Sequence, residues 1–251
     1  MSAPKVAGII PARYDSSRLP GKPLKMIGAL SMIERVYKRC MEADLLDFVV
    51  VATDDTRIVD AVEAFGGQAV MTKVDHLSGT DRLAEAAEKI DADIIVNIQG
   101  DQPFIDPVMI SEGVQPLLDD PTLEIATLMY PISREEDIVD PGVVKVVTDL
   151  DGNALYFSRS LIPYPRESIE HGVYEHVGLY VYRKDTLLKL ADLPPTILER
   201  VESLEQLRWL QHGLRIHVRE THCADQAFSG LSVDTMEDLA RAADLAKERG
   251  L

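Results

Sequence analysis

Short apolar runs and helix-period segments alternate along the first hundred residues of the chain. Residues 6–11, 48–52 and 94–98 are mostly apolar, which is typical of strands buried inside a sheet, and residues 68–71 add a shorter strand. Between these runs, apolar side chains recur every three or four positions, as they do along one face of a helix. The alternation predicts right-handed crossovers and therefore an α/β fold with a mostly parallel sheet flanked by helices.

Signals for helix ends agree with these periods. A polar loop runs from the first strand to Gly28, and Ser31 is then followed three positions later by Glu34, the spacing of a capping box. The next helix is stopped by the glycines at 66–67, and residues 78–81 (SGTD) form a turn that can cap a third helix. The three segments therefore read as the crossover helices of the predicted sheet.

The second half of the chain has a different rhythm. A turn at residues 149–152 joins the segments 143–148 and 154–158 into a predicted hairpin. The sequence further predicts, in chain order, a strand at 178–182, a helix at 198–212, a strand at 214–218 and a helix that begins after Thr235. The break at residues 140–142 indicates a smaller lobe within the single domain of 251 residues, over roughly 140–215, with dimerisation as a candidate role.

Composition and charge restrict the function. Lys and Arg total 26 and Asp and Glu total 42, so the formal charge is 26 − 42 = −16, which argues against a sequence-independent nucleic-acid binder. A small anionic ligand remains compatible, because a few cations in one cleft dominate the local potential. Two cysteines exclude a disulfide framework or a four-thiolate zinc site. With no leader-like or membrane-length apolar segment, we expect a cytoplasmic protein without a membrane partner.

The loop after the first strand carries the strongest chemical signal. Arg13, Arg18 and Lys22 place three cations where a parallel sheet binds its ligands, beyond the carboxyl end of a strand. Arginine offers a planar fork for phosphate and lysine a mobile point charge, and Gly21 allows the backbone to come close. The loop matches neither the Walker A motif nor the dinucleotide fingerprint, which argues against a nicotinamide dehydrogenase.

Two carboxylates complement these cations. Asp101 follows the strand at 94–98, where it is well placed to hold Mg²⁺ against a triphosphate, and Asp234 precedes the last helix. Taken singly, each is as readily a turn or helix-capping residue. Together with the three cations, the pair is consistent with a metal-bound nucleotide as ligand.

Further candidates carry weaker signals. The turn before the third helix could meet a base or ribose through its N–H groups and a phosphate through Arg82, with simple helix capping as the alternative. Candidate substrate contacts in the second half are Arg159, His176, Glu205, Gln206 and Arg208. Their ordinary alternatives are a structural histidine beside strands and a solvated helix face. Tyr180 and Tyr182 alternate with Leu179 and Val181, so either the tyrosines or the aliphatic pair could face a cleft.

Long motifs at these positions resemble the 3-deoxy-manno-octulosonate (Kdo) cytidylyltransferase family, also called CMP-Kdo synthetases. The chain carries, in order, IIPARYDSSRLPGKPL, ATDD, DHLSGTDR, NIQGDQP, VKVV, ALYFSR, IPY, HVGLYVYRK, LEQLR, GLRIHV and VDTMEDL. The resemblance spans essentially the whole chain. It implies a nucleotide-diphospho-sugar transferase type of fold with a dimerisation lobe, a homodimer, and a reaction that joins CMP from CTP to a sugar acid and releases pyrophosphate.

The resemblance also implies roles for individual residues. Arg13, Arg18 and Lys22 would hold the triphosphate, and Lys22, Arg13 and Asp101 would be catalytic. The neighbours of the cytidine and phosphates would include Ala12, Ser78, Gly79, Arg82 and Gln99. Asp101 and Asp234 would bind Mg²⁺. The sugar acid would be bound by Arg159, His176, Tyr180, Glu205 and Gln206, with Arg159 pairing with its carboxylate.

Departures from the family pattern bear on the acceptor. Gln102 stands where the family usually has Glu, and Val181 where it often has Gly or Ala, and both could reshape the acceptor pocket. Transfer of CMP to 8-amino-Kdo or to a phosphonate such as phosphonoformate is therefore an alternative. A non-catalytic nucleotide-binding relative is a more remote one, because it predicts loss of a cation or of the acid pair, and all are present.

Overall fold

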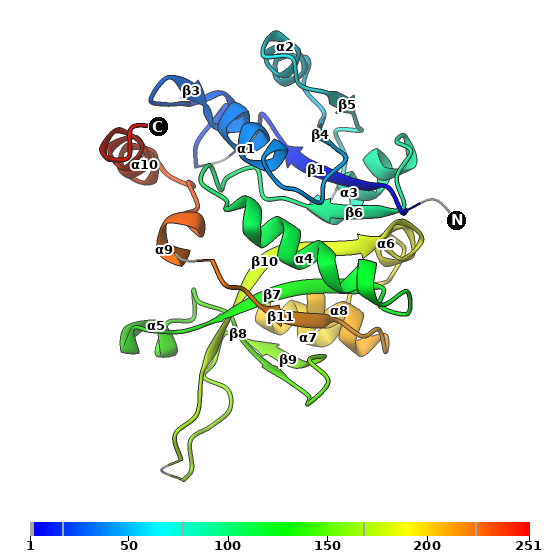
Figure 1. Cartoon of the computed structure of the whole chain (residues 1–251), viewed down its shortest axis with the longest axis vertical. Coiled ribbons are helices and arrows are strands. Elements are labelled where there is room, and N and C mark those ends of the chain that lie inside the picture. Colours follow the sequence, from blue (N-terminus) through cyan, green and yellow to red (C-terminus); the bar gives the residue numbers. More distant parts are fainter. Residues whose placement is uncertain (1–2, 17, 77, 168, 224) are drawn as a thin grey trace. The chain divides into compact units, whose positions relative to one another are not determined.

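Two units divide the chain, and each is built around its own set of strands (Figure 1). The computed structural model describes residues 3–16, 18–76, 78–167, 169–223 and 225–251. The first unit comprises residues 1–111 and 223–251, and the second comprises residues 112–222. Helix α4 (Pro107–Asp119) contains the boundary between them.

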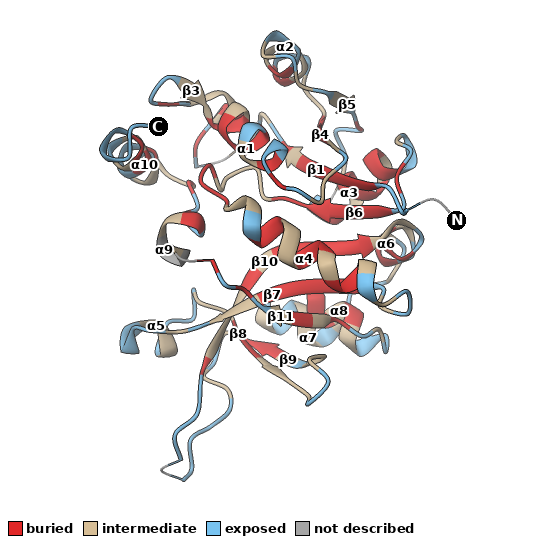
Figure 2. Ribbon diagram, viewed as in Figure 1, coloured by how far each residue is buried: buried red, intermediate tan, exposed pale blue. Residues whose placement is uncertain are grey.

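The sheet of the first unit is parallel, as the sequence predicts. Its strands lie in the order β6 (Ile94–Asn97), β1 (Val6–Ala12), β4 (Phe48–Thr53) and β5 (Ala69–Met71), and every neighbouring pair is parallel. The strands β1, β4 and β6 are almost wholly buried (Figure 2). Because the four strands run the same way, the loops that follow them emerge at one edge of the sheet.

Helices of the first unit begin where the sequence places their caps. Helix α1 (Met32–Met41) is capped by Ser31, whose side chain accepts the N–H of Glu34. Helices α3 (Gly79–Glu88) and α10 (Met236–Glu248) each start with a complete capping box. The remaining elements are η1 (Lys22–Leu24), β2 (Met26–Ile27), β3 (Leu30–Ser31), α2 (Thr56–Ala64) and α9 (Gln226–Ser229). Thus the predicted polar loop before α1 contains a short helix and a small hairpin.

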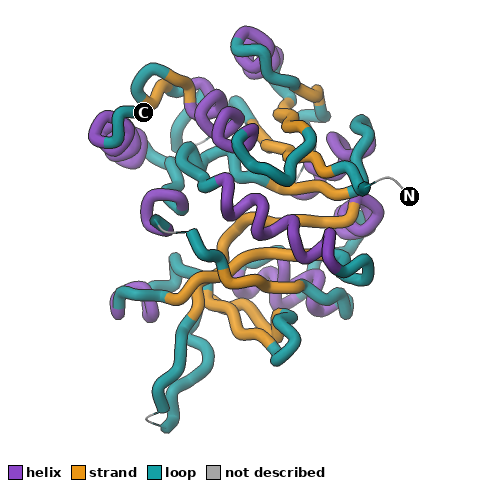
Figure 3. The backbone as a smooth tube through the Cα atoms, in the orientation of Figure 1, coloured by secondary structure: helices purple, strands orange, loops and turns teal. Residues whose placement is uncertain are grey.

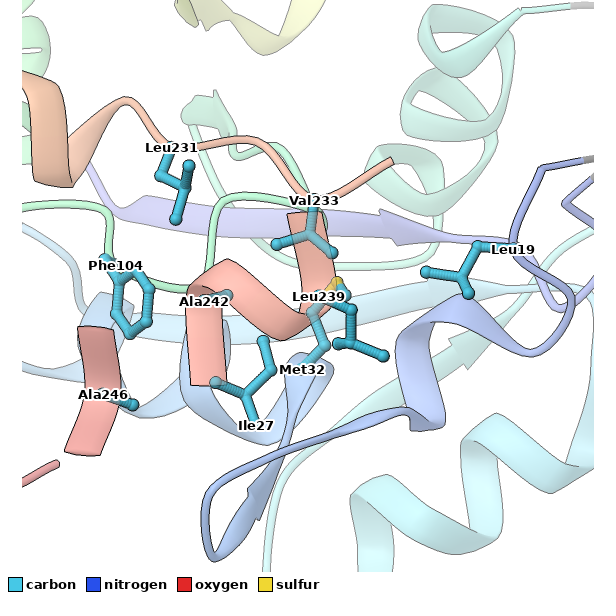
Figure 4. Close-up of a cluster of buried hydrophobic side chains, with 9 residues drawn as sticks. All are labelled: Leu19, Ile27, Met32, Phe104, Leu231, Val233, Leu239, Ala242 and Ala246. Carbon is cyan, nitrogen blue, oxygen red and sulfur yellow. The ribbon is translucent and has the colours of Figure 1, made fainter. Parts of the chain in front are cut away.

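A hydrophobic cluster joins the two ends of the chain within this unit (Figure 4). Leu19 and Ile27 of the first loop pack in it with Val233 and with Leu239 of α10. Its other buried members are Met32, Phe104, Leu231, Ala242 and Ala246. Burial of apolar area contributes roughly 25 cal/mol per Å², so this cluster fixes the segment before α10 against the first loop.

The strands of the second unit pair mostly in the antiparallel sense. Their order is β11 (His217–Glu220), β7 (Ile125–Pro131), β10 (Tyr174–Arg183), β8 (Lys145–Thr148) and β9 (Ala154–Ser158), and only β11 with β7 is parallel among these pairs. The hairpin of β8 and β9 confirms the prediction. The segment that leads from β9 to β10 is a long loop (Figure 3).

The prediction of one helix over residues 198–212 is wrong. Two short helices, α7 (Ile197–Glu202) and α8 (Gln206–Gln211), replace it because Ser203 between them adopts a left-handed conformation with φ of 54°. Left-handed backbone is uncommon for a residue other than glycine, and nothing in the local sequence signals it. The structure also adds α5 (Glu135–Val139) and α6 (Lys184–Ala191), which the apolar periodicity did not reveal.

Strand ends in the second unit differ from their predicted positions. β10 extends several residues before the predicted start at 178, and β11 begins after the predicted start at 214. Such boundaries depend on pairing partners, which the period of one strand does not encode. Within the described residues, no helix is both long enough and apolar enough to cross a bilayer.

Candidate active site

The predicted cationic loop borders a hollow at the carboxyl edge of the first unit's sheet. The hollow has a volume of about 330 Å³. It is lined by Pro11, Ala12, Arg13, Asp15, Ser16, Arg18, Lys22, Pro23, Gln99, Gly100 and Asp101. The loops after β1 and β6 therefore meet here, as expected for adjacent parallel strands. Six of these lining residues, Ala12, Arg13, Arg18, Lys22, Gln99 and Asp101, were predicted from the sequence.

A tight turn aims Lys22 at this hollow. Gly21 has a φ of +66°, and its N–H donates to the carbonyl of Tyr14 at 3.0 Å. A Cβ on Gly21 would also come within 3.3 Å of the Tyr14 ring, so both the backbone conformation and the space favour glycine. Pro23 then fixes the start of η1, which leaves Lys22 at the head of a short rigid segment.

The ammonium of Lys22 lies between the two predicted metal-binding acids. Its Nζ is 2.8 Å from Oδ2 of Asp101 and 2.9 Å from Oδ1 of Asp234, and the Lys22 side chain is only 14% exposed. The same Oδ1 of Asp234 accepts Nη2 of Arg18 at 3.0 Å. Two cations and two carboxylates that are far apart in sequence therefore converge at one edge of the hollow.

Close backbone approach holds Asp101 in place. A Cβ on Gly100 would lie 2.8 Å from the carbonyl oxygen of Pro11, so the loop after β6 can press against β1 only without a side chain there. The carbonyl of Asp101 accepts the N–H of Val233 at 2.9 Å. That bond and the buried side chain of Val233 bring Asp234 to the same place.

The two carboxylates fit a hard divalent cation such as Mg²⁺. They are oxygen donors held next to one another, and Mg²⁺ is commonly held by one or two carboxylates together with substrate phosphates and water. Among the described residues, no group of three or more His, Cys, Asp or Glu side chains could hold a metal ion. A metal here would therefore need ligands from the nucleotide or from water in addition to Asp101 and Asp234.

Arg13 is linked to the turn before α3. Its Nη2 donates to the carbonyl of His76 at 3.2 Å, and the carboxylate of Glu85 holds both the ring of His76 and the N–H of Lys73.

Ser78 caps α3 by exchanging hydrogen bonds with Asp81. The structure is therefore compatible with both alternatives, helix capping and nucleotide contact, since the capped turn still presents the N–H groups that begin a helix.

Arg82 occupies a different environment from the one its predicted phosphate contact requires. The residue is fully buried, and its guanidinium pairs with Asp54 at 2.7 Å and donates to the hydroxyl of Thr72. At Gly79, by contrast with the buried Arg82, a Cβ would meet no atom within 4 Å, so this end of the turn is open. In this structure Arg82 joins the ends of β4 and β5 to α3. Asp54, in the ATDD motif, is a partner that the sequence analysis did not assign.

The predicted acceptor residues all belong to the second unit. The rings of His176 and Tyr180 on β10 lie 5.3 Å apart, and Trp209 packs edge-on against Tyr180 at 5.1 Å. Burial raises the pKa of Tyr180 well above its usual value, and the nearby carboxylate of Glu205 raises it further. Its hydroxyl has no hydrogen-bond partner within the described part of the chain. Gln206 follows Glu205 at the start of α8 and is buried.

Hydrogen bonds define the tautomer of His176. The hydroxyl of Thr127 lies 3.0 Å from Nε2 of His176 and also 3.0 and 2.7 Å from the carbonyls of Val177 and Leu179. Carbonyls can only accept, so the single hydroxyl proton goes to one of them and Nε2–H donates to the hydroxyl. Nδ1 is then left as an acceptor. Dense packing around the ring lowers its pKa to about 3, which keeps it neutral.

This burial predicts a loss of stability in mild acid. Between pH 6.5 and about 3, His176 is protonated in the unfolded chain but not in the folded chain. The free energy of unfolding is therefore highest above pH 6.5 with respect to this group, and it decreases as the pH falls. For pH 7.5 to 5.5 the loss is at most about 1.4 kcal/mol. We expect His176→Gln to lose less stability over this interval than the wild type in urea unfolding. The surface variant His171→Gln is the control, and an unchanged pH dependence in His176→Gln would contradict the assignment.

Arg159 is held by main-chain carbonyls. Its Nε donates to the carbonyl of Glu202 at 2.7 Å and Nη1 to that of Pro141 at 2.9 Å, while its own N–H donates to the carboxylate of Glu202. Sequence reasoning missed Glu202 and also the fully buried Lys145. A signal for Lys145 was available, because it interrupts a run of four valines at residues 143–147.

Comparisons with known proteins show the family to which the chain belongs. A family model described as cytidylyltransferase matches residues 7–216. A 3-deoxy-manno-octulosonate cytidylyltransferase of Syntrophotalea carbinolica is 52% identical over 245 residues, covering 94% of this chain and 96% of the relative. The corresponding protein of Geotalea daltonii is 49% identical, covering 98% of this chain and all of the relative.

A solved structure is similar over nearly the full length as well. It is that of CMP:2-keto-3-deoxy-manno-octonic acid synthetase complexed with CTP, with a TM-score of 0.92 and 46% sequence identity. The match covers 98% of this chain and 99% of that chain. Similarity at this level shows that the two chains share the fold over nearly their full length.

Proposed function

Because the chain belongs to the 3-deoxy-manno-octulosonate cytidylyltransferase family, we propose that it transfers CMP from CTP to Kdo, giving CMP-Kdo and pyrophosphate. The observation that carries this proposal is the convergence of Lys22 and Arg18 on Asp101 and Asp234 at the rim of a cationic hollow. Such an arrangement suits a triphosphate with a bound cation.

Arg13, Arg18 and Lys22 form the triphosphate grip in this proposal. The reaction is an in-line attack by the anomeric hydroxyl of the acceptor on the α-phosphorus, and pyrophosphate leaves. Such a transfer depends on positioning and on neutralising charge more than on a covalent nucleophile. Lys22, at the head of the rigid segment η1, steadies the charge that develops on the α-phosphate and the leaving group. Ala12, Ser78, Gly79, Arg82 and Gln99 surround the nucleotide or support its surroundings.

Asp101 and Asp234 are the proposed ligands of Mg²⁺. When bound, Mg²⁺ would offset the negative charge of the phosphates. In the structure the ammonium of Lys22 lies between the two carboxylates, an arrangement that supports a role for positive charge at this position. The contact of the Lys22 ammonium with both carboxylates supports Asp101 as a catalytic residue together with Lys22 and Arg13.

The acceptor contacts are proposed on the second unit. A sugar acid combines several hydroxyls with one carboxylate. Nδ1 of neutral His176 can accept a hydrogen bond, and the hydroxyl of Tyr180 can donate one, which suits sugar hydroxyls. Glu205 and Gln206 extend this polar set, and Arg159 pairs with the carboxylate. A compact phosphonate would leave the first four of these side chains unused.

Pyrophosphate release with an acceptor panel tests the function. Purified protein with Mg²⁺ and CTP is offered Kdo, 8-amino-Kdo, a sialic acid and phosphonoformate separately. We expect release with Kdo, formation of CMP-Kdo by mass spectrometry, and no release when CTP is replaced by ATP. Release with phosphonoformate alone would keep the transfer chemistry but overturn the acceptor. A folded protein that binds CTP and releases pyrophosphate with none of the four would overturn the enzymatic assignment.

Two broader expectations stay predictions from the sequence and the family resemblance. One is a homodimer formed through the lobe at residues 140–215. The other is a cytoplasmic location. Sedimentation equilibrium measures the first, and fractionation of the source cells measures the second.

A further inference from the structure

A fully buried lysine lies beside the proposed carboxylate-binding arginine. Lys145 of β8 has no exposed surface, and its Nζ donates to three main-chain carbonyls. These are the carbonyls of Asp140 and Val143, each at 2.8 Å, and of Arg159 at 2.9 Å. An ammonium has three N–H donors, so all of them are satisfied.

Burying the ammonium of Lys145 costs free energy, because the charged group loses its hydration. Burial disfavours the charged form and lowers the pKa of Lys145, and its hydrogen-bond acceptors are neutral carbonyls. An apolar side chain of similar length would fill much of the same volume but would remove the ammonium donor from all three carbonyls, of which that of Asp140 still accepts the N–H of Val143 at 3.2 Å. The lysine therefore ties together two segments that the hairpin alone does not connect, the turn at 140–143 and the residue after β9.

Arg159 donates a hydrogen bond to the same turn. Nη1 of Arg159 donates to the carbonyl of Pro141, while Nε and Nη2 reach the carbonyls of Glu202 and Ser203 at 2.7 and 3.5 Å. These three bonds use three of the five N–H groups of the guanidinium. One N–H on each terminal nitrogen remains, which is a pair that a carboxylate can bind.

We propose that Lys145 is a positioning residue for acceptor recognition: it fixes the main chain of Arg159 and the turn at 140–143, so that the guanidinium presents its two remaining N–H groups to the acceptor's carboxylate. The inference deepens the proposed function and rests on it. Lys145 touches neither substrate in this proposal and acts only through Arg159.

Steady-state kinetics of Lys145→Met test the inference. With CTP saturating and Kdo varied, we expect the KM for Kdo to rise about tenfold to a hundredfold, because a misplaced binding group weakens one substrate selectively. The KM for CTP should stay within about twofold, since neither Lys145 nor the residues whose carbonyls it contacts line the hollow. Lys189→Met, an exposed lysine of α6, is the matched control and should leave both values unchanged.

A comparison of acid and ester separates positioning from simple loss of structure. Kdo and its methyl ester are compared as acceptors or as competitive inhibitors. The wild type should prefer the acid, and this preference should collapse in Lys145→Met and in Arg159→Met, with no further loss in the double variant. A purely structural role would weaken acid and ester equally. If Lys145→Met does not fold, Lys145→Gln serves, because its amide keeps two donors without the charge.

The wild type tests the proposed function, and the Lys145 variants test the role of Lys145. Wild-type protein that releases no pyrophosphate with Kdo overturns the proposed function. Wild-type protein that is active with Kdo, together with a folded Lys145 variant that keeps the wild-type KM for Kdo or the wild-type preference for acid over ester, overturns only the role of Lys145.

Discussion

Pyrophosphate release by Lys22→Met is expected to fall about a thousandfold below the wild type, because the proposed role of the ammonium is to neutralise charge that develops in the transition state. In the structure this ammonium contacts Asp101 and Asp234 at 2.8 and 2.9 Å, so it lies where phosphate, metal and carboxylate charges meet. Methionine is an unbranched side chain one atom shorter than lysine, and it has neither the charge nor the N–H donors of the ammonium. The loss should therefore fall mainly on kcat, with the fold retained.

The neighbouring lysine gives a matched control for this experiment. Lys25 follows η1 and does not line the hollow, so Lys25→Met removes the same charge without touching the grip. We expect Lys25→Met to retain wild-type turnover, as measured by continuous pyrophosphate release at saturating CTP and Kdo. Turnover of Lys22→Met within about threefold of the wild type would show that its ammonium is not required.

Asp101→Asn is expected to lower Mg²⁺-dependent turnover by about a hundredfold to a thousandfold, because one of the two proposed carboxylate ligands loses its charge. The concentration of Mg²⁺ that gives half-maximal rate should rise as well. Asparagine is nearly isosteric, and the backbone bond from Val233 to the carbonyl of residue 101 does not depend on the side chain. The loss therefore reports on charge at this position.

Metal binding can be followed apart from turnover. Isothermal titration of Mg²⁺ into the protein with a non-hydrolysable CTP analogue should give weaker binding for Asp101→Asn than for the wild type. Asp60→Asn, an exposed carboxylate on α2, controls for the change in net charge and should bind as the wild type does. If Asp101→Asn keeps the wild-type metal affinity and metal dependence, Asp101 is not a ligand.

Local patterns allowed a large part of the first unit to be predicted. Apolar runs gave β1, β4, β5 and β6, and Ser78 and Thr235 marked helix starts that the structure confirms as capping boxes. These features depend on neighbours in sequence, since helix period, strand period and capping are set within a few residues. The parallel order then placed the loop with Lys22 and the loop with Asp101 at one edge.

The second unit was less predictable because its decisive features are not local. The left-handed Ser203 divides the predicted helix at 198–212, and no glycine or proline marks it. Lys145 is surrounded by valines in sequence, yet its partners include the carbonyl of Arg159, fourteen residues away. Family resemblance named Arg159, but only the contacts show how the chain holds it.

The sequence by itself determined the parallel α/β fold, the cationic loop at its edge and, through long motifs, the family. Tertiary structure alone decided that Asp234 reaches Lys22 across 212 residues and that Arg82 is buried against Asp54. The physical reason is that periodicity and capping act over a few residues. Pairing between distant charges instead depends on the hydrophobic cluster that packs α10 and Val233 against the first loop.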